Sequence, residues 1–280
     1  MTLYERMETT DELAGALTGT LFAGKLRHFA EIDSTNLQAM REAAAGAEHG
    51  TVYIADAQSA GRGRGAHTWH SSPGDGLYCS LLLRPHSTLS AADALWFSLA
   101  TGLAVASAVE SVTSLRADIR WPNDLLLGEK KFCGILTELS ADSAHVRHAV
   151  IGIGININHA AFPSELQSLA TSLRIASGQR WSRAAILAAL LRAMQTEMSG
   201  LLAVDNTHNA HEDILRRLLQ QSTWMQGKRV HVDEAGGYTG VTAGLNAQGF
   251  LQVQTATGLR TVLSGGVRNW DAEQTHAAGH

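Results

Sequence analysis

Apolar and polar positions follow two different patterns along the chain, and the pattern changes near residue 224. Before that point, apolar segments of strand length are joined by short turns and by a few longer helical stretches. After Gly227, polar and apolar residues alternate over short segments that glycine-containing turns separate. We therefore predict a domain of residues 1–224, a second domain of residues 225–270, and a disordered tail of residues 271–280.

The first of these domains is expected to be built on one sheet. Its predicted strands are residues 25–32, 51–57, 77–85, 117–121, 125–127, 131–139 and 145–156. Its predicted helices follow the N-cap run Asp33-Ser34-Thr35 and cover residues 89–112 and roughly 183–222. Because hairpins join most of the strands, this pattern predicts an α+β fold rather than a doubly wound parallel sheet. We expect a mixed, mostly antiparallel sheet with helices on one face, followed by a small C-terminal SH3-like β-barrel.

Composition excludes several classes of function. The chain has 280 residues, and its net charge of -4 gives no bulk electrostatic reason to expect nucleic-acid binding. The first 24 residues contain one weak helical pattern, too short for a helix-turn-helix domain. No apolar run approaches the roughly 20 residues of a membrane helix, and no secretory signal is present. Cys79 and Cys133 lack metal-ligand spacing. We expect a reduced, cytoplasmic protein without a membrane or nucleic-acid partner.

The strongest chemical signal is the sequence Gly-Arg-Gly-Arg-Gly at residues 61–65. Alternating glycines allow the backbone to approach a ligand, and Arg62 and Arg64 suit a phosphate or an acyl phosphate. The simpler interpretation is a flexible basic loop that binds nothing. An RNA-binding Gly-Arg segment would need many repeats, whereas this loop lies between two apolar strands. The loop matches neither a Walker loop nor a Rossmann turn.

Two further segments carry candidate ligand contacts. Trp-Pro-Asn-Asp at residues 121–124 is followed by Lys130 and Lys131, where a hairpin with solvated lysines is the simpler interpretation. Lys131 opens an apolar strand, so its side chain could neutralise phosphate charge.

The strand that ends in Gly-Ile-Gly-Ile-Asn at residues 152–156 contains two glycines, which indicate a close approach of backbone or ligand. Asn156 could bind that ligand, or it could simply lead into a turn.

Taken together and in this order, these motifs resemble the biotin protein ligase family. The resemblance covers about 240 residues, including the C-terminal barrel. The motifs on which it rests are residues 31–36, 57–64, 121–124, 131–134 and 152–156. It implies an enzyme that uses ATP and Mg²⁺ to form biotinyl-5′-AMP. The enzyme then transfers biotin to a lysine of a biotin carboxyl carrier protein domain, such as that of acetyl-CoA carboxylase. A homodimer is compatible with this family.

The resemblance also implies roles for particular residues. Residues expected to bind biotin are Ser34, Thr35, Asn36, Gln58, Gly61, Arg62, Lys131 and Gly134. Residues expected to bind ATP or the adenylate are Arg62, Arg64, Trp69, Lys131 and Asn156. Arg62 and Lys131 are the candidate catalytic groups, and the ligands of Mg²⁺ are not indicated. Some relatives carry further arginines after this loop, where this chain has His67. His67 could replace the charge of such an arginine only in part, because histidine is mostly neutral at pH 7.

Three alternatives compete with this interpretation. A lipoate ligase shares the fold and the acyl-adenylate chemistry, but the glycine loop and the barrel favour biotin. A biotin-sensing repressor would carry a DNA-binding domain, against which the short N-terminus and the acidic balance argue. A non-catalytic biotin-binding module would have no need for Lys131, Arg62 and Arg64.

Overall fold

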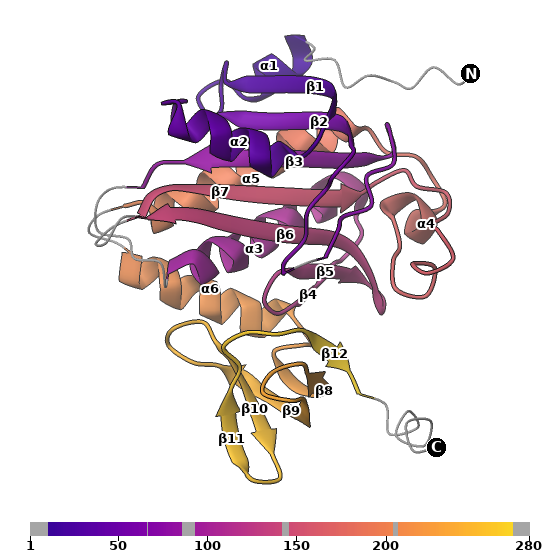
Figure 1. Ribbon diagram of the computed structural model, residues 1–280, viewed down its shortest axis with the longest axis vertical. Helices are drawn as coiled ribbons and strands as arrows, with labels where there is room; N and C mark the ends of the chain where they lie inside the picture. Colours follow the sequence, from indigo (N-terminus) through magenta and orange to yellow (C-terminus); the bar gives the residue numbers. More distant parts are fainter. Residues whose placement is uncertain (1–10, 66, 86–92, 142–145, 204–206, 271–280) are drawn as a thin grey trace.

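The computed structural model describes residues 11–65, 67–85, 93–141, 146–203 and 207–270, and within them the chain forms two β-sheets (Figure 1). The first sheet has seven strands in the order β1-β2-β3-β7-β6-β5-β4. Its members are β1 (Leu26–Ile32), β2 (Val52–Gln58), β3 (Gly76–Leu83), β4 (Asp118–Arg120), β5 (Asp124–Leu127), β6 (Lys130–Ala141) and β7 (Val146–Asn156). β1 and β2 pair in parallel, and the other neighbours pair antiparallel. The predicted α+β fold with a mixed, mostly antiparallel sheet is confirmed.

Helices cover both faces of this sheet, so the expectation of one covered face was wrong in part. α3 (Ala94–Thr113) and α5 (Arg183–Leu201) pack against each other behind the sheet, as Figure 1 shows. α2 (Thr35–Ala44) lies on the opposite face, where Ala39 and Ala43 pack on Tyr53, Leu82 and Val150. Every residue of β3 is buried because helices lie on both of its sides.

Local capping explains where the principal helices begin. The Ser34 hydroxyl accepts from the Leu37 amide at the start of α2, and Ser182 does the same for Ala185 at the start of α5. The predicted stretch 183–222 is two helices, α5 and α6 (Thr207–Gln221). The short helices α1 (Asp11–Ala16) and α4 (Leu173–Ser177) complete the set among the described residues. Residues 89–92 of the predicted helix 89–112 lie outside the described residues.

One helix corrects the statement that no apolar run reaches membrane length. α3 has 20 residues and is apolar enough to cross a membrane by length and composition alone. Two thirds of the residues in its apolar 18-residue stretch are buried inside the fold, and the helix contacts α5, α6 and several strands. It has the character of a core helix, whose apolar residues face protein on several sides.

The second sheet contains β8 (Gln226–Val232), β9 (Tyr238–Leu245), β10 (Leu251–Thr255), β11 (Gly258–Thr261) and β12 (Val267–Asn269). All of its pairings are antiparallel, in the order β11-β10-β9-β8-β12, in agreement with the small barrel predicted from the alternating pattern. The Trp121 indole donates to the Gly249 carbonyl at 3.0 Å and ties the two sheets together. The boundary near residue 224 stays a prediction, and the tail 271–280 lies outside the described residues.

Candidate active site

A cavity of about 850 Å³ lies on the face of the large sheet that carries α2. Its walls come from segments far apart in the sequence: the start of α2, the glycine loop, the turn before β5, and residues 162–170. Residues in or next to β8 and β12 of the second sheet, including Asp233, Gly266 and Arg268, also line it. The site is therefore built jointly by both sheets.

The floor of the cavity depends on glycines in β6 and β7. Gly134 and Gly154 pair across the two strands, and a methyl group at either position would collide with the Trp69 indole, at 2.8 and 2.5 Å. A methyl group at Gly152 would collide with the Asn36 carboxamide. The close approach expected from glycines in a buried strand is thus made by the side chains of Trp69 and Asn36.

One end of the cavity is neutral and internally hydrogen-bonded. The backbone amide and the hydroxyl of Thr35 both donate to the side-chain carbonyl of Gln58, at 2.9 and 3.1 Å. The buried Ser80 hydroxyl lies 2.8 Å from the Thr35 hydroxyl and 2.5 Å from the Asn36 side-chain carbonyl. Gln58 also donates to Ser71 at 3.0 Å. Hydroxyl and amide groups held in this way suit a polar, uncharged ligand group.

The other end is charged. The Asp124 carboxylate contacts the Lys131 ammonium at 2.5 Å and the Arg120 guanidinium at 2.7 Å. Burial alone would raise the pKa of Asp124, but Lys131 and Arg120 outweigh burial and hold the pKa below its ordinary value. Arg64 donates to the Asn123 side-chain carbonyl at 3.2 Å, and burial lowers the pKa of its guanidinium. Among the residues that the structure describes here, cations outnumber carboxylates, which suits an anionic ligand.

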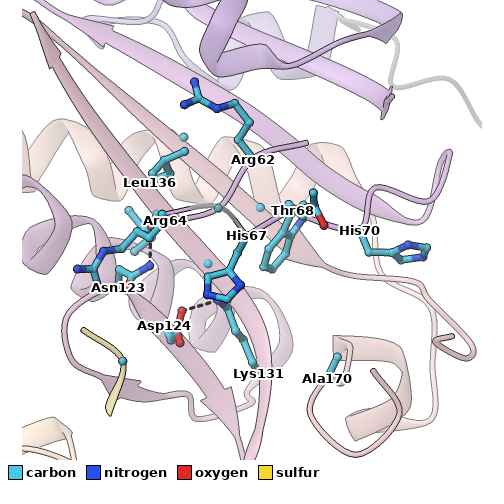
Figure 2. Close-up of a pocket in the computed structure, with 18 of the residues that line it drawn as sticks. Arg62, Arg64, His67, Thr68, His70, Asn123, Asp124, Lys131, Leu136 and Ala170 are labelled. Carbon is cyan, nitrogen blue, oxygen red and sulfur yellow. Dashed lines mark hydrogen bonds and ion pairs between the residues drawn. The ribbon is translucent and has the colours of Figure 1, made fainter. Parts of the chain in front are cut away.

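The two loop arginines point to different ends of the cavity (Figure 2). Arg64 reaches toward Asn123 in the charged end, whereas Arg62 forms an ion pair with Glu138 at 3.0 Å. Glu138 also accepts from the Asn36 carboxamide at 2.9 Å. Arg62 is therefore connected to the neutral end and Arg64 to the charged end.

Most of the residues proposed from sequence line this one cavity. They are Ser34, Thr35, Asn36, Gln58, Arg62, Arg64, Trp69, Lys131, Gly134 and Asn156. Gly61 does not line it, because it lies against the Trp69 carbonyl, where a methyl group would approach to 2.6 Å. Ser34 acts as the N-cap of α2, and the side-chain amide of Asn156 donates to the Thr171 backbone carbonyl at 3.1 Å. His67 lines the mouth and is exposed.

The adjacent lysines have different surroundings. The Lys131 ammonium lies in the cavity, 5.3 Å from the centre of the Trp69 ring. Lys130 is exposed, and its ammonium donates to the Gln167 carbonyl at 2.7 Å. Successive strand residues point to opposite faces, which separates Lys130 from Lys131. The pairing of β6 with β5 is irregular at Leu125/Leu126, and this irregularity lets Lys131 share the cavity face with Gly134.

Sequence reasoning missed several residues that build the site. It assigned no role to Arg120, Asn123 or Asp124, although the last two belong to a motif that it singled out. Ser80 and Glu138 were also missed. The available signals were a hydroxyl within an otherwise apolar buried strand for Ser80, and strand alternation with Gly134 and Leu136 for Glu138.

The described residues offer no dedicated cage for a metal ion. No group of three or more His, Cys, Asp and Glu side chains comes together in the part of the chain that the structure describes. The Asp124 carboxylate of the charged end is already engaged by Lys131 and Arg120. A Mg²⁺ ion that depends mainly on substrate phosphates and water is compatible with this set.

Comparison with known proteins places this cavity in a known family. Residues 29–156 match the model of the biotin/lipoate A/B protein ligase family. A biotin–[acetyl-CoA-carboxylase] ligase from Mycobacterium tuberculosis is 31% identical over 259 residues, 90% of each chain. A bifunctional ligase/repressor BirA from Bacillus spizizenii is 35% identical over 241 residues, which cover 83% of this chain and 70% of that protein.

Solved structures agree with the sequence matches. The biotin protein ligase from Aquifex aeolicus, solved in complex with biotin and ATP, superposes with a TM-score of 0.75 at 30% identity. The match covers 88% of this chain and 100% of that one, and so includes residues of both sheets. These relationships show that the chain belongs to the biotin/lipoate A/B protein ligase family, among its biotin protein ligases.

Proposed function

We propose that this protein forms biotinyl-5′-AMP from biotin and ATP and transfers the biotin to a lysine of a carrier domain. The observation that carries this proposal is a single cavity in which a neutral, hydrogen-bonded end adjoins a cationic end. Biotin has the matching character, with an uncharged ureido ring at one end and a carboxylate at the other. The Aquifex aeolicus ligase, which has the same fold, was solved with biotin and ATP together.

The neutral end would hold the biotin ring. Thr35, Asn36 and Gln58 supply hydroxyl and amide groups there, and Gly134 gives room on the floor. Ser34 contributes by starting α2, whose first turn carries Thr35 and Asn36 into the site. Gly61 would act through the loop backbone, because it packs behind Trp69.

The charged end would carry the adenylation step. A biotin carboxylate oxygen attacks the α-phosphorus of ATP, the bond to the β-phosphate oxygen breaks, and pyrophosphate leaves. Negative charge grows on the phosphate during this step, and fixed cations stabilise it. Lys131 and Arg64 point into this end, Trp69 and Asn156 lie beside it, and Arg62 would join them only by leaving Glu138.

The second step uses the same cavity. The carrier lysine amine attacks the acyl carbon, the bond to the phosphate oxygen breaks, and AMP leaves. An acyl phosphate hydrolyses readily in water, so a covering loop would protect it until the carrier arrives. Arg62, Arg64 and His67 of the glycine loop line the cavity, so this loop would supply such a cover.

The proposal extends to partners and setting. The carrier would be the biotin carboxyl carrier domain of acetyl-CoA carboxylase or of a related carboxylase, because the Mycobacterium tuberculosis relative is named for that substrate. Mg²⁺ would enter with ATP. The net charge of -4 supports an enzyme that does not bind nucleic acid. We also propose a cytoplasmic location, since Cys79 and Cys133 fit a reduced protein, and a homodimer is compatible with the family.

Biotin-dependent exchange of pyrophosphate into ATP tests the first step, and transfer of labelled biotin to a carrier domain tests the second. We expect both with biotin and neither with lipoate. Exchange that depends on lipoate would favour the lipoate ligase alternative, and tight biotin binding without exchange would favour a non-catalytic module. A shift of DNA mobility by the protein in a gel-shift assay would favour the repressor alternative.

A further inference from the structure

We propose that Glu138 is a positioning residue that fixes Asn36 and Arg62 for biotin binding. The three residues form what we call the Glu138 tie. This inference rests on the proposed function, because the two fixed side chains lie in the end assigned to the biotin ring. Glu138 itself is not among the residues that line the cavity, so it would act through the two that do.

Strand alternation explains why Glu138 faces this side of the sheet. Gly134, Leu136 and Glu138 follow one another at every second position of β6, and the first two line the cavity. Glu138 is thus the next residue on the same face, one step beyond the cavity and near the start of α2. Its side chain is 23% exposed, which leaves the carboxylate partly shielded from water.

The carboxylate determines how the Asn36 amide is oriented. One Glu138 oxygen accepts from the Asn36 nitrogen at 2.9 Å, and the same nitrogen donates to the Leu136 carbonyl at 3.3 Å. The Asn36 oxygen faces the Ser80 hydroxyl at 2.5 Å. Asn36 is 4% exposed and lies directly over Gly152, so the amide has little room to move. Loss of the acceptor would leave a buried donor unsatisfied.

The same carboxylate holds the glycine loop. The Arg62 guanidinium contacts both Glu138 oxygens, at 3.0 and 3.3 Å. The loop closes on itself through the Gly63 amide, which donates to the His67 carbonyl at 2.8 Å. The ion pair therefore connects a self-contained loop to the sheet, and it joins the loop to α2 because Asn36 shares the carboxylate. The pair also neutralises Arg62, whereas Arg64, at the other end, forms no close ion pair with the described carboxylates and donates to Asn123 instead.

The experiment compares Glu138→Ala, Glu138→Gln and Arg62→Ala in the full chain. A glutamine can still accept from Asn36 but has no charge for Arg62. We expect the biotin KM in pyrophosphate exchange to rise by roughly tenfold for Glu138→Ala and by less for Glu138→Gln, while the ATP KM changes little. The double variant Arg62→Ala/Glu138→Gln should match Arg62→Ala alone, because both remove one interaction. Additive effects, or an unchanged biotin KM in Glu138→Ala, would overturn the proposal.

A matched control and a second readout separate this idea from the proposed function. Glu110 forms an ion pair with Arg116 at the same distance of 3.0 Å, on the exposed surface away from the cavity, so Glu110→Gln should behave as wild type. Trypsin cleavage after Arg64, without ligand, should be faster in Glu138→Gln than in Glu110→Gln. Equal cleavage rates contradict the tie. If wild type shows no biotin-dependent exchange, the proposed function fails, and the cleavage comparison still tests the tie.

Discussion

The two ends of the cavity reach a stable arrangement by opposite means. At the neutral end, Thr35, Gln58 and Ser80 pair with one another, so the donors and acceptors satisfy each other before any ligand arrives. At the charged end, Asp124 is shared between Lys131 and Arg120. Arg64 has the neutral Asn123 amide as its hydrogen-bond partner and interacts with the Asp124 charge only at longer range.

This difference indicates that the neutral end serves ligand recognition and that the charged end stabilises the reacting phosphate. A preformed hydrogen-bonded pocket loses little conformational entropy on binding, and so serves recognition. A surplus of fixed cations stabilises an anion, and most of all one whose charge grows during the reaction. The predictions below test this division, from the largest expected effect to the smallest.

Removal of the shared carboxylate is expected to have the largest effect. Asp124→Ala leaves Lys131 and Arg120 close together without compensation, so we expect the free energy of unfolding to fall by roughly 3 kcal/mol or more. Urea unfolding measures this. Asp33→Ala is the control, because Asp33 forms an ion pair with Arg41 at the exposed surface and should contribute little. Equal losses in the two variants would show that the charged end is not a special cluster.

The loop arginines give the next largest effect. Arg64→Ala should weaken adenylation by about 1.5–3 kcal/mol, the range for a hydrogen bond to a charged group, seen as slower pyrophosphate release at saturating biotin. Arg62→Ala should act mainly on the biotin KM, because Arg62 lies with the neutral end. If Arg62→Ala instead slowed saturated pyrophosphate release more than Arg64→Ala, the assignment of the two arginines to opposite ends would be reversed.

Acid should act on His159, a buried residue whose ring stacks on the cavity residue Phe162 at 5.0 Å between ring centres. Burial and the nearby His70 lower the pKa of His159 from 6.5 to about 4. Between these values the unfolded chain binds a proton that the folded chain does not, so stability falls as the pH is lowered through this window. From pH 6.5 to 4.5 the expected loss is about 2 kcal/mol.

Urea unfolding of wild type and His159→Gln at both pH values measures that loss. Other buried histidines titrate in both proteins, so the difference between them isolates His159. Parallel pH dependence in the two proteins would remove His159 as the cause. Asp124 should stay ionised over this range, because its pKa is held below the ordinary value.

The smallest effect separates two neighbouring lysines. Lys131→Ala should slow adenylation by roughly tenfold, equivalent to about 1.4 kcal/mol, because it removes a cation from the charged end. Lys130→Ala should change little, as exposed substitutions usually do. Both variants lose one positive charge, so the pair controls for net charge. Equal slowing would mean that general electrostatics, not position, accounts for the effect.

Local patterns predicted the fold better than the site. Strand alternation and the Ser34 cap place most of the large sheet and the start of α2, because these signals depend on neighbouring residues. The position of α2 on the second face of the sheet was missed, since a helix of ten residues does not indicate which face it covers. The Glu138 contacts could not be derived from spacing, because Asn36 and Glu138 are 102 positions apart. The resemblance to relatives named the residues of the glycine loop, but only the coordinates showed that its two arginines point to different ends.

The glycines beneath Trp69 and Asn36 have a consequence for how this site can change. Positions 134, 152 and 154 have no space for even one further carbon atom, so the floor does not tolerate substitution of these glycines. Saturation mutagenesis at these three positions should therefore yield almost no active variants. Variants with altered ligand preference should instead come from the walls, where Leu136 and His67 border the same cavity and larger or smaller side chains can be exchanged.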